Sequence, residues 1–467
     1  MDELRIDPGE EEPTEASEPE EDIDAIVIDR LAAYGIESEP ASDEEQSAGS
    51  DPTGLAPEPE HEFAVEGSVS DTEPLADPPS VPRVEDTEPS PSRRFGRQRG
   101  EVSSKPEKST SSKDKRPKRI IGLKIGASQI AAAQVVNNGA PELIEVFREP
   151  LEPGLVVSGE IRDPDALGEA LKRFFELHKL PKRGIRLGLA NNRIGVRVFE
   201  IEGVTDPQQL ENAIRFRAEE VLPIPLDQAV LDYVVLEDEA REDGTSVKRI
   251  LLVVAYREVV DRYLQACRGA GLEVIGIDLE AFALLRSLEA PTDRDSGAGA
   301  LVAVGIGHDR TTIAVSTGRL CEFTRVLDWG GWSLNIAIAR ELDKAPSEVE
   351  AIKRQLSLAR ETEVEGLTSD QVTKVRDAVQ RALAAFAREL TASLHFYQAQ
   401  PGALGIGEIV LSGGTAHMDG LPEAVGELVG VPIRLGDPFK RVKVGPNVTL
   451  DIQHGSVAVA IGLGIED

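Results

Sequence analysis

The sequence predicts an α/β protein with two similar halves, preceded by a disordered N-terminal tail. Strand-like apolar runs alternate with helical apolar stripes from residue 120 to the end of the chain. A strand, a glycine turn and a second strand occur together near residue 126 and again near residue 307. The first 90 residues are rich in Glu, Pro, Ser and Asp and poor in apolar side chains, so they lack the material for a core.

Most of the negative charge lies in the tail. The 467 residues carry a formal net charge of −32, and residues 1–90 hold 29 acidic against 3 basic side chains. Residues 91–120 reverse this balance with 11 basic and 3 acidic ones. We therefore expect residues 1–118 to be a disordered acidic tail that ends in a basic linker. The linker either contacts anionic lipid or nucleic acid, or folds back on the acidic tail, and we expect no nucleic-acid partner for the protein.

The rarer residue types exclude several classes of protein. Cys267 and Cys321 are the only cysteines, which excludes a disulfide framework or a cysteine-based zinc site and fits a reducing cytosol. No apolar run approaches the roughly 20 residues that span a bilayer, and we find no signal peptide, so we expect no integral membrane protein. The histidines show no metal-ligand spacing, and we expect no metal site built from them.

The first half is predicted over residues 119–291. Its strands are short apolar runs, and two of its helices begin at Asp-Pro pairs, where Asp163 and Asp206 are suited to cap the helix and the proline to fill its first turn. In order, we expect strands at 120–125, 130–136, 142–151, 185–190, 196–201, 230–236, 249–255 and 273–277, and helices at 163–178, 206–221 and 257–268.

The second half is predicted over residues 299–436, after a linker rich in Pro, Gly and Asp. Strands at 301–304 and 311–315 lead into a largely helical stretch at 333–398. A strand at 408–411 is followed by a helix from Leu421. We expect residues 437–467 to return to the first half.

Three glycine turns are candidates for binding a phosphorylated ligand. Gly126 and Gly307 each follow a buried strand, and Gly413 with Gly414 ends a third one, Ile409–Ser412. Glycine accepts a positive φ and lets a ligand approach the backbone, so amide N–H groups can face phosphate oxygens. A Gly-Gly turn before a helix lets a flat base or ribose lie against bare backbone.

These turns resemble the nucleotide cleft of the actin-like ATPases, and further segments resemble the family of the type IV pilus assembly protein PilM within that group. In family order they read EEVLPIPL followed by VLDY (219–233), LLVVAYREVVDRY (251–263) and GIDLEAFALLRSL (276–288). The resemblance covers residues 119–467. It implies an actin-like ATPase fold of two RNase H-like halves, each with an added subdomain, similar to FtsA. The added pieces would be a module at about 205–275 and a helical insertion at about 340–402.

The resemblance also implies a nucleotide site and a partner groove. The residues that it places at the nucleotide are Lys124, Gly126, Ala127, Ser128, Gly307, His308, Asp309, Thr311, Glu389, Ser412, Gly413, Gly414 and Thr415. In the family, a groove on the first half holds the cytoplasmic N-terminal peptide of the membrane protein PilN. For that groove we name Ile214, Leu222, Ile224, Tyr233 and Val235, with the module's own core as the alternative role of each.

The chain departs from the family at both acidic positions of the cleft. The usual D-I-G hairpin reads Lys124-Ile125-Gly126 in the first copy, and Gly305 stands at the acidic position of the second copy. Mg²⁺ beside a nucleotide prefers one or two carboxylate ligands, and hydrolysis needs a positioned water, so the departure argues against Mg²⁺ and against ATP hydrolysis. Lys124 either replaces the metal's charge, giving ATP binding without turnover, or pairs with a neighbouring carboxylate in a relic cleft that binds no nucleotide.

The function implied by the resemblance is a cytoplasmic scaffold, peripheral at the inner membrane, in a type IV pilus or related secretion machine. Its partners would be a PilN-like protein and, as a second candidate, further copies of itself, with contact to the membrane only through the PilN-like partner. The alternative is an FtsA-like cytoskeletal ATPase of cell division. FtsA-type anchoring uses an amphipathic basic C-terminal helix, whereas residues 458–467 are apolar, broken by glycine and acidic.

Overall fold

The computed structural model describes residues 119–221, 225–241, 244–289, 297, 299–318, 320–446, 448 and 454–466. They belong to one compact unit. The predictions for the tail and its basic linker, and those for Leu222 and Ile224, lie outside the described residues. Within the described ranges, no helix combines the length and the apolar character that a bilayer crossing requires.

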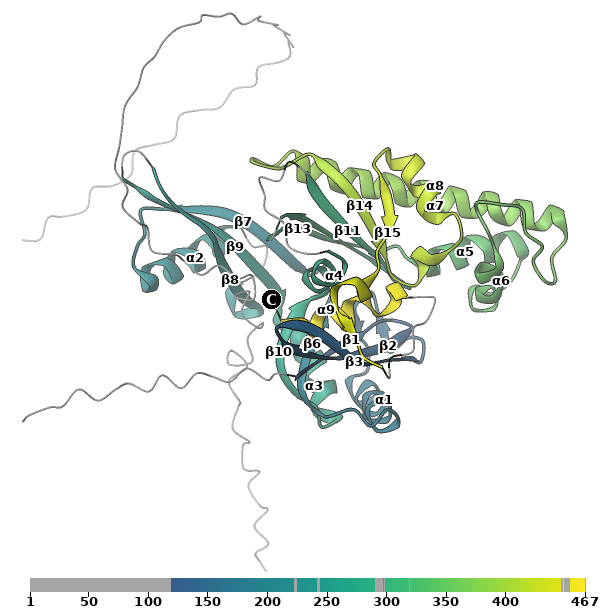
Figure 1. Ribbon diagram of the computed structural model, residues 1–467, viewed down its shortest axis with the longest axis horizontal. Helices are drawn as coiled ribbons and strands as arrows, with labels where there is room; N and C mark the ends of the chain where they lie inside the picture. Colours follow the sequence, from purple (N-terminus) through teal and green to yellow (C-terminus); the bar gives the residue numbers. More distant parts are fainter. Residues whose placement is uncertain are drawn as a thin grey trace, which may run out of the picture. The chain divides into compact units, whose positions relative to one another are not determined.

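A six-stranded mixed sheet forms the centre of the first half (Figure 1). The strand order is β10-β6-β1-β2-β3-β16, in which β1 pairs antiparallel with β2 and parallel with β6. Its strands are β1 (Arg119–Ile125), β2 (Gln129–Asn138), β3 (Ala140–Pro150), β6 (Arg183–Leu189), β10 (Glu273–Leu279) and β16 (Lys443–Val444).

Helices cover both faces of this sheet because its central strands are apolar on both sides. Ile130 and Ala132 of β2 belong to the core shared with α1 (Pro164–Leu177) and α3 (Arg257–Gly269). Ala131, Ala133 and Val135 alternate with them and pack on the opposite face against α9 (Ala458–Gly464). As predicted, Asp163 caps α1, and its Oδ1 accepts hydrogen bonds from the backbone N–H groups of the first turn.

A separate three-stranded sheet forms the added module, with strand order β7-β9-β8. It comprises β7 (Ile194–Glu202), β8 (Ala229–Ala240), β9 (Ser246–Tyr256) and the helix α2 (Pro207–Val221). We placed the module at about 205–275, yet α3 packs on α1 and β10 pairs with β6. Both of these elements therefore belong to the first half's main sheet, whereas β7, which precedes residue 205, belongs to the module.

The second half repeats the arrangement of the first. Its five-stranded sheet has the order β13-β12-β11-β14-β15, and β11 pairs antiparallel with β12 and parallel with β14, as β1 does with β2 and β6. The predicted α/β fold is thus confirmed. The elements are β11 (Ala300–Ile306), β12 (Thr311–Thr317), β13 (Leu320–Leu327), α5 (Gly331–Leu342), α6 (Glu350–Gln355), α7 (Ser369–Gln398), β14 (Ile406–Ser412), α8 (Leu421–Val429) and β15 (Ile433–Leu435).

The end of the chain returns to the first half. β16 pairs with β3, and every residue of α9 is buried between the main sheet and the connecting helix α4 (Glu280–Leu288). Arg186 donates hydrogen bonds to the carbonyl oxygens of Leu463 and Ile465 at 3.1 and 3.0 Å. These bonds satisfy carbonyl groups at the end of α9 that have no partner within the helix.

The α9–α4 crossing depends on a glycine, which gives a test of this packing. A Cβ at Gly462 would overlap the carbonyl oxygen of Ala283 on α4. We expect Gly462→Ala to lower the free energy of unfolding by about 1–3 kcal/mol, as overpacked cores do. Urea denaturation measures the change. Gly405→Ala, where a Cβ meets no atom within 4 Å, is the control, and equal stabilities of the two variants would contradict the crossing.

Candidate nucleotide cleft

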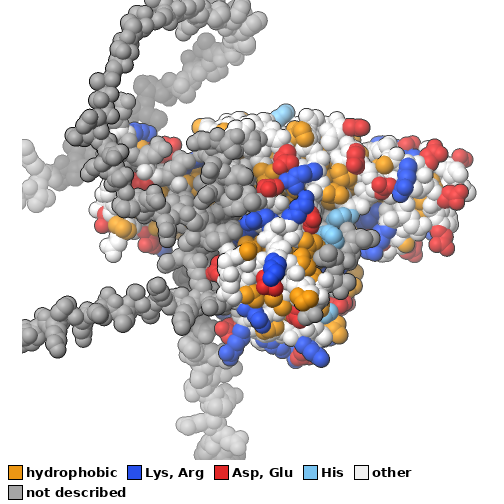
Figure 2. Space-filling model, viewed as in Figure 1, with side chains coloured by type: hydrophobic (Ala, Val, Ile, Leu, Met, Phe, Trp, Pro, Cys, Tyr) orange, Lys and Arg blue, Asp and Glu red, His pale blue; other side chains and the backbone are white. Residues whose placement is uncertain are grey.

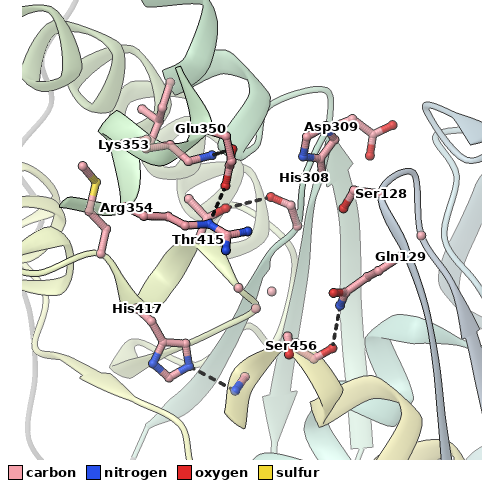
Figure 3. A pocket seen from close by; sticks show the side chains of 18 of the residues that line it. Ser128, Gln129, His308, Asp309, Glu350, Lys353, Arg354, Thr415, His417 and Ser456 are labelled. Atoms are coloured by element: carbon pink, nitrogen blue, oxygen red, sulfur yellow. Dashed lines mark hydrogen bonds and ion pairs between the residues drawn. The ribbon is translucent and has the colours of Figure 1, made fainter. Parts of the chain in front are cut away.

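A cleft of about 650 Å³ lies between the two halves, where the three predicted turns meet (Figure 3). Its size lies within the range of small-molecule sites. The turns contribute Gly126–Gln129, Gly307–Arg310 and Gly413–Thr415. The remaining lining residues are Lys124, Glu280, Leu284, Gly305, Thr312, Leu334, Glu350, Lys353, Arg354, Gln355, Leu356, Ser357, Arg360, Thr362, His417, Met418, Asp419, Gly455, Ser456 and Val459.

The two hairpin turns are closed by the same hydrogen bond. The amide of Gly126 donates to the carbonyl of Gln129 at 2.9 Å, and the amide of Gly307 donates to the carbonyl of Arg310 at 2.9 Å. This match supports the repeat inferred from the sequence. Since both glycine amides are used within their hairpins, a phosphate at the turns would meet the amides that follow them.

The third turn packs directly on the second half's hairpin. Gly413 has φ +92, and a Cβ there would overlap the carbonyl oxygen of Ile306, so only glycine fits. The hydroxyl of Thr415 donates to the carbonyl of Gly307 at 3.0 Å. On the other side, the amide of Gly413 donates to the carbonyl of Gly455 at 3.2 Å. The third turn is therefore fixed to the second half's hairpin and to the backbone at Gly455.

Lys124 forms an ion pair with Glu280 at the base of the cleft. The distance between Lys124 Nζ and Glu280 Oε2 is 2.8 Å, and the side chain of Glu280 is only 2% exposed. Of the two interpretations of Lys124, the one that pairs it with a neighbouring carboxylate matches this contact. The sequence did not single out Glu280 for the cleft, although it opens α4 within the family segment at 276–288.

The acidic groups present do not fit a magnesium ion. Gly305 packs against Leu284 and carries no ligand atom, and the Glu280 carboxylate is paired with Lys124. Oδ2 of Asp309 accepts a hydrogen bond from the backbone amide of Ser158 at 2.8 Å. Within the part of the chain that the structure describes, no group of three or more His, Cys, Asp and Glu side chains is arranged to hold a metal. The nucleotide turns are present, but the carboxylates that Mg²⁺ favours beside them are not.

One wall of the cleft is a charged network on α6 that the sequence did not predict. Glu350 accepts from Lys353 and Arg354 at 2.8 and 3.1 Å, and from Asn335 at 3.0 Å. Burial would raise the pKa of Glu350, but these hydrogen bonds outweigh it and lower the pKa to about 2. Burial, followed by the nearby Lys353 ammonium, lowers the pKa of His308 below its usual value.

Three residues that the resemblance placed at the nucleotide lie outside the cleft. Thr311 is buried and its hydroxyl donates to the carbonyl of Trp329 at 2.8 Å. Ser412 is also buried, with its hydroxyl donating to Gly455. Glu389 lies on α7, which packs against α5, and the cleft lining includes no residue of α7. The structure therefore places Glu389 outside the cleft, where α6 contributes wall residues instead.

Of the residues named for the partner groove, the three that the structure describes belong to or pack against the module's own core. Ile214 on α2 is 2% exposed and belongs to the cluster between α2 and the module sheet. Tyr233 and Val235 on β8 are half-buried and pack against the same cluster. Burial leaves Ile214 without a face for a peptide, whereas the two β8 residues keep part of their surface.

Comparisons with known proteins agree with the fold. The chain matches the family described as "Type IV pilus assembly protein PilM" over residues 122–467. A solved structure titled "PilM-PilN type IV pilus biogenesis complex" is similar with a TM-score of 0.62 and 26% identity, covering 75% of this chain and 98% of that chain. The cell division protein FtsA of Pseudomonas aeruginosa is 26% identical over 356 residues, covering 69% of this chain and 84% of that protein. FtsA of Escherichia coli K12 is 24% identical over 362 residues, with the same coverage.

The ion pair in the cleft can be tested by a double-mutant cycle. We expect Lys124→Met to lower the free energy of unfolding by about 2 kcal/mol, because it leaves the buried Glu280 carboxylate without a cation. Adding Glu280→Gln should restore most of this loss, since the buried charge is then gone. Chemical denaturation at pH 7 measures both steps. If the losses of the two single variants simply add in the double variant, the pair does not exist in solution.

Proposed function

On the premise that the chain belongs to the type IV pilus assembly protein PilM family, we propose that it is a cytoplasmic scaffold of a type IV pilus or related secretion machine. It binds the cytoplasmic N-terminal peptide of a PilN-like inner-membrane protein and reaches the membrane through that partner. The observation that carries the proposal is the likeness to the chain of the PilM–PilN complex, which the described fold covers almost completely.

The module offers one sheet edge for such a peptide. Of its two edge strands, β7 lies against β13 of the second half, and Arg249 on β9 pairs with the buried Glu322 on β13 at 3.2 Å. The opposite edge strand is β8, which pairs with β9. A peptide added to β8 would gain main-chain hydrogen bonds and contact the half-exposed side chains of Tyr233 and Val235.

In this proposal the cleft binds a nucleotide as a structural ligand and does not hydrolyse it. The turns and the cavity volume suit a nucleotide, but the acids that would hold Mg²⁺ and orient a water are replaced by Lys124 and Gly305. The cleft of this protein keeps its structure without repeated ATP hydrolysis. We therefore assign the protein a binding role and no ATPase activity.

The FtsA-like alternative is less well supported, despite the identity to FtsA proteins. The last described helix, α9, is buried along its whole length, and the side chains of Arg186 and Asn137 bind the carbonyl groups at its end. A helix in this position is part of the core and does not serve as an amphipathic surface anchor. On the face shown in Figure 2, basic and acidic side chains are interspersed over the described surface.

ATP turnover should be absent. Because neither acidic position of the cleft holds a carboxylate, the purified protein with Mg–ATP should release phosphate no faster than a matched preparation of a Gly414→Val variant. A Cβ at Gly414 lies in the cleft lining and meets only the Ser456 side chain within 4 Å, so this variant obstructs the cleft without overlapping the backbone. A phosphate-release assay measures the difference. Magnesium-dependent release by the wild type that the Gly414→Val variant lacks would contradict the proposal.

Peptide binding should lie in the folded part. Residues 119–467 should bind the N-terminal peptide of the PilN-like protein with a dissociation constant on the order of micromolar, because the peptide must be ordered on binding. Tyr233→Ala should weaken binding about tenfold. Phe396→Ala, which removes an aromatic ring 60% exposed on α7, is the control. Isothermal titration calorimetry measures these affinities. Binding by the full chain but not by residues 119–467 would show that the peptide binds the acidic tail, and it would contradict the prediction.

A further inference from the structure

Two side chains at the tip of the second half's hairpin cross the cleft into the first half. Asp309 and Arg310 lie in the β11–β12 turn, at the place where a phosphate-binding turn faces its ligand. Their partners are Ser158 and Gly159, which form the turn between β4 (Val156–Val157) and β5 (Glu160–Ile161), and Tyr263 on α3. These five residues are called the latch below.

The carboxylate of Asp309 is bound to the first half's backbone. Its Oδ2 accepts the amide of Ser158 at 2.8 Å, and the carbonyl of Ser158 accepts from the buried Asn191 side chain at 3.1 Å. Ser158 and Gly159 have φ of 51 and 74, the left-handed pair that closes a two-residue hairpin. The turn is thus shaped and fixed before Asp309 reaches it, which lowers the entropic cost of the contact.

Arg310 is inserted more deeply than Asp309. It is 5% exposed although it belongs to the rim of a cleft, and it lies so close to Gly159 that a Cβ there would overlap its guanidinium. The Tyr263 hydroxyl donates to the carbonyl of Gly159 at 3.2 Å and also interacts with Arg310. Burial alone would lower the pKa of Arg310, but Tyr263, Glu280 and Asp309 around it raise it, so the charge is retained.

The charges at the base of the cleft therefore balance within the protein. Lys124 pairs with Glu280, and Arg310 lies among Glu280, Asp309 and Tyr263. A buried cation is strongly held once it is surrounded by acidic groups and hydrogen bonds, and removing one member leaves the others uncompensated.

We propose that the latch holds the two halves of the cleft closed in the absence of nucleotide and metal. When two halves close around a ligand, the ligand contacts both of them. Here the contacts of the latch join the two halves directly, so the closed form is the conformation of the protein without a ligand. The inference does not depend on the proposed pilus role, because it concerns only contacts within the chain.

The test is a distance measurement across the mouth of the cleft in the full chain. Spin labels are placed at Glu152→Cys, next to the Ser128 turn, and at Glu361→Cys, between the lining residues Arg360 and Thr362; both positions are exposed. The native cysteines are buried. Pulsed electron spin resonance in EDTA should give one narrow distance distribution that Mg–ATP leaves unchanged.

Variants of the latch residues distinguish an effect on the closure of the cleft from an effect on overall stability. Asp309→Ala and Arg310→Met should each broaden the distribution and lengthen its mean, whereas Arg388→Met, an exposed arginine on α7, should match the wild type. If Arg310→Met fails to fold, Asp309→Ala decides alone, since Asp309 is only partly buried. A wild-type distribution that narrows only with Mg–ATP, or an Asp309→Ala distribution equal to that of the wild type, would overturn the proposal.

Discussion

A carboxylate buried between two domains needs a cation, and in this chain Lys124 supplies it to Glu280. Glu280 opens the helix that connects the halves, and Lys124 lies on the central strand of the first sheet. The ion pair thus ties the connecting helix to the strand that leads into the first turn. The same ammonium stands at the position where the family resemblance predicts an acid, so the residue that supports the cleft through this contact provides no magnesium ligand.

Backbone packing fixes the glycines of the cleft whatever the cleft binds. A side chain at Gly413 would overlap β11, and one at Gly122 would overlap α9. Replacing either glycine would therefore disturb the core of one half. The glycine turns of this cleft are thus explained by the fold alone, and they do not by themselves require that the protein hydrolyses a nucleotide.

Local patterns predicted much of this structure. The paired hairpins, the Asp163 cap and the matched glycine turns depend on residues close together in sequence, and they were found where expected. The module boundary was not, because the pairing of β10 with β6 joins segments about 90 residues apart. The wall at Glu350 and Lys353 was missed for a related reason. Charged pairs on a short helix look the same whether they face solvent or a cleft.

The prediction for Ile214 differs from the structure because a helical stripe of apolar residues does not show whether it faces the protein's own core or a partner. Ile214 lies on an amphipathic helix, and its spacing suits both a core and a groove until the partner of that face is known. The structure places it against the module sheet. The remaining edge strand, β8, is where we propose that the peptide binds, and β8 contributes no residue to the cleft lining.

A scaffold that does not hydrolyse ATP and that binds its peptide at β8, outside the cleft, should bind its partner without nucleotide or metal. This expectation is tested by titrating the N-terminal peptide of the PilN-like protein into the full chain by calorimetry, once in EDTA and once with Mg–ATP. We predict the same affinity and enthalpy in both buffers. Binding that appears only with Mg–ATP would contradict the proposed function, because a site outside the cleft would then depend on a ligand of the cleft.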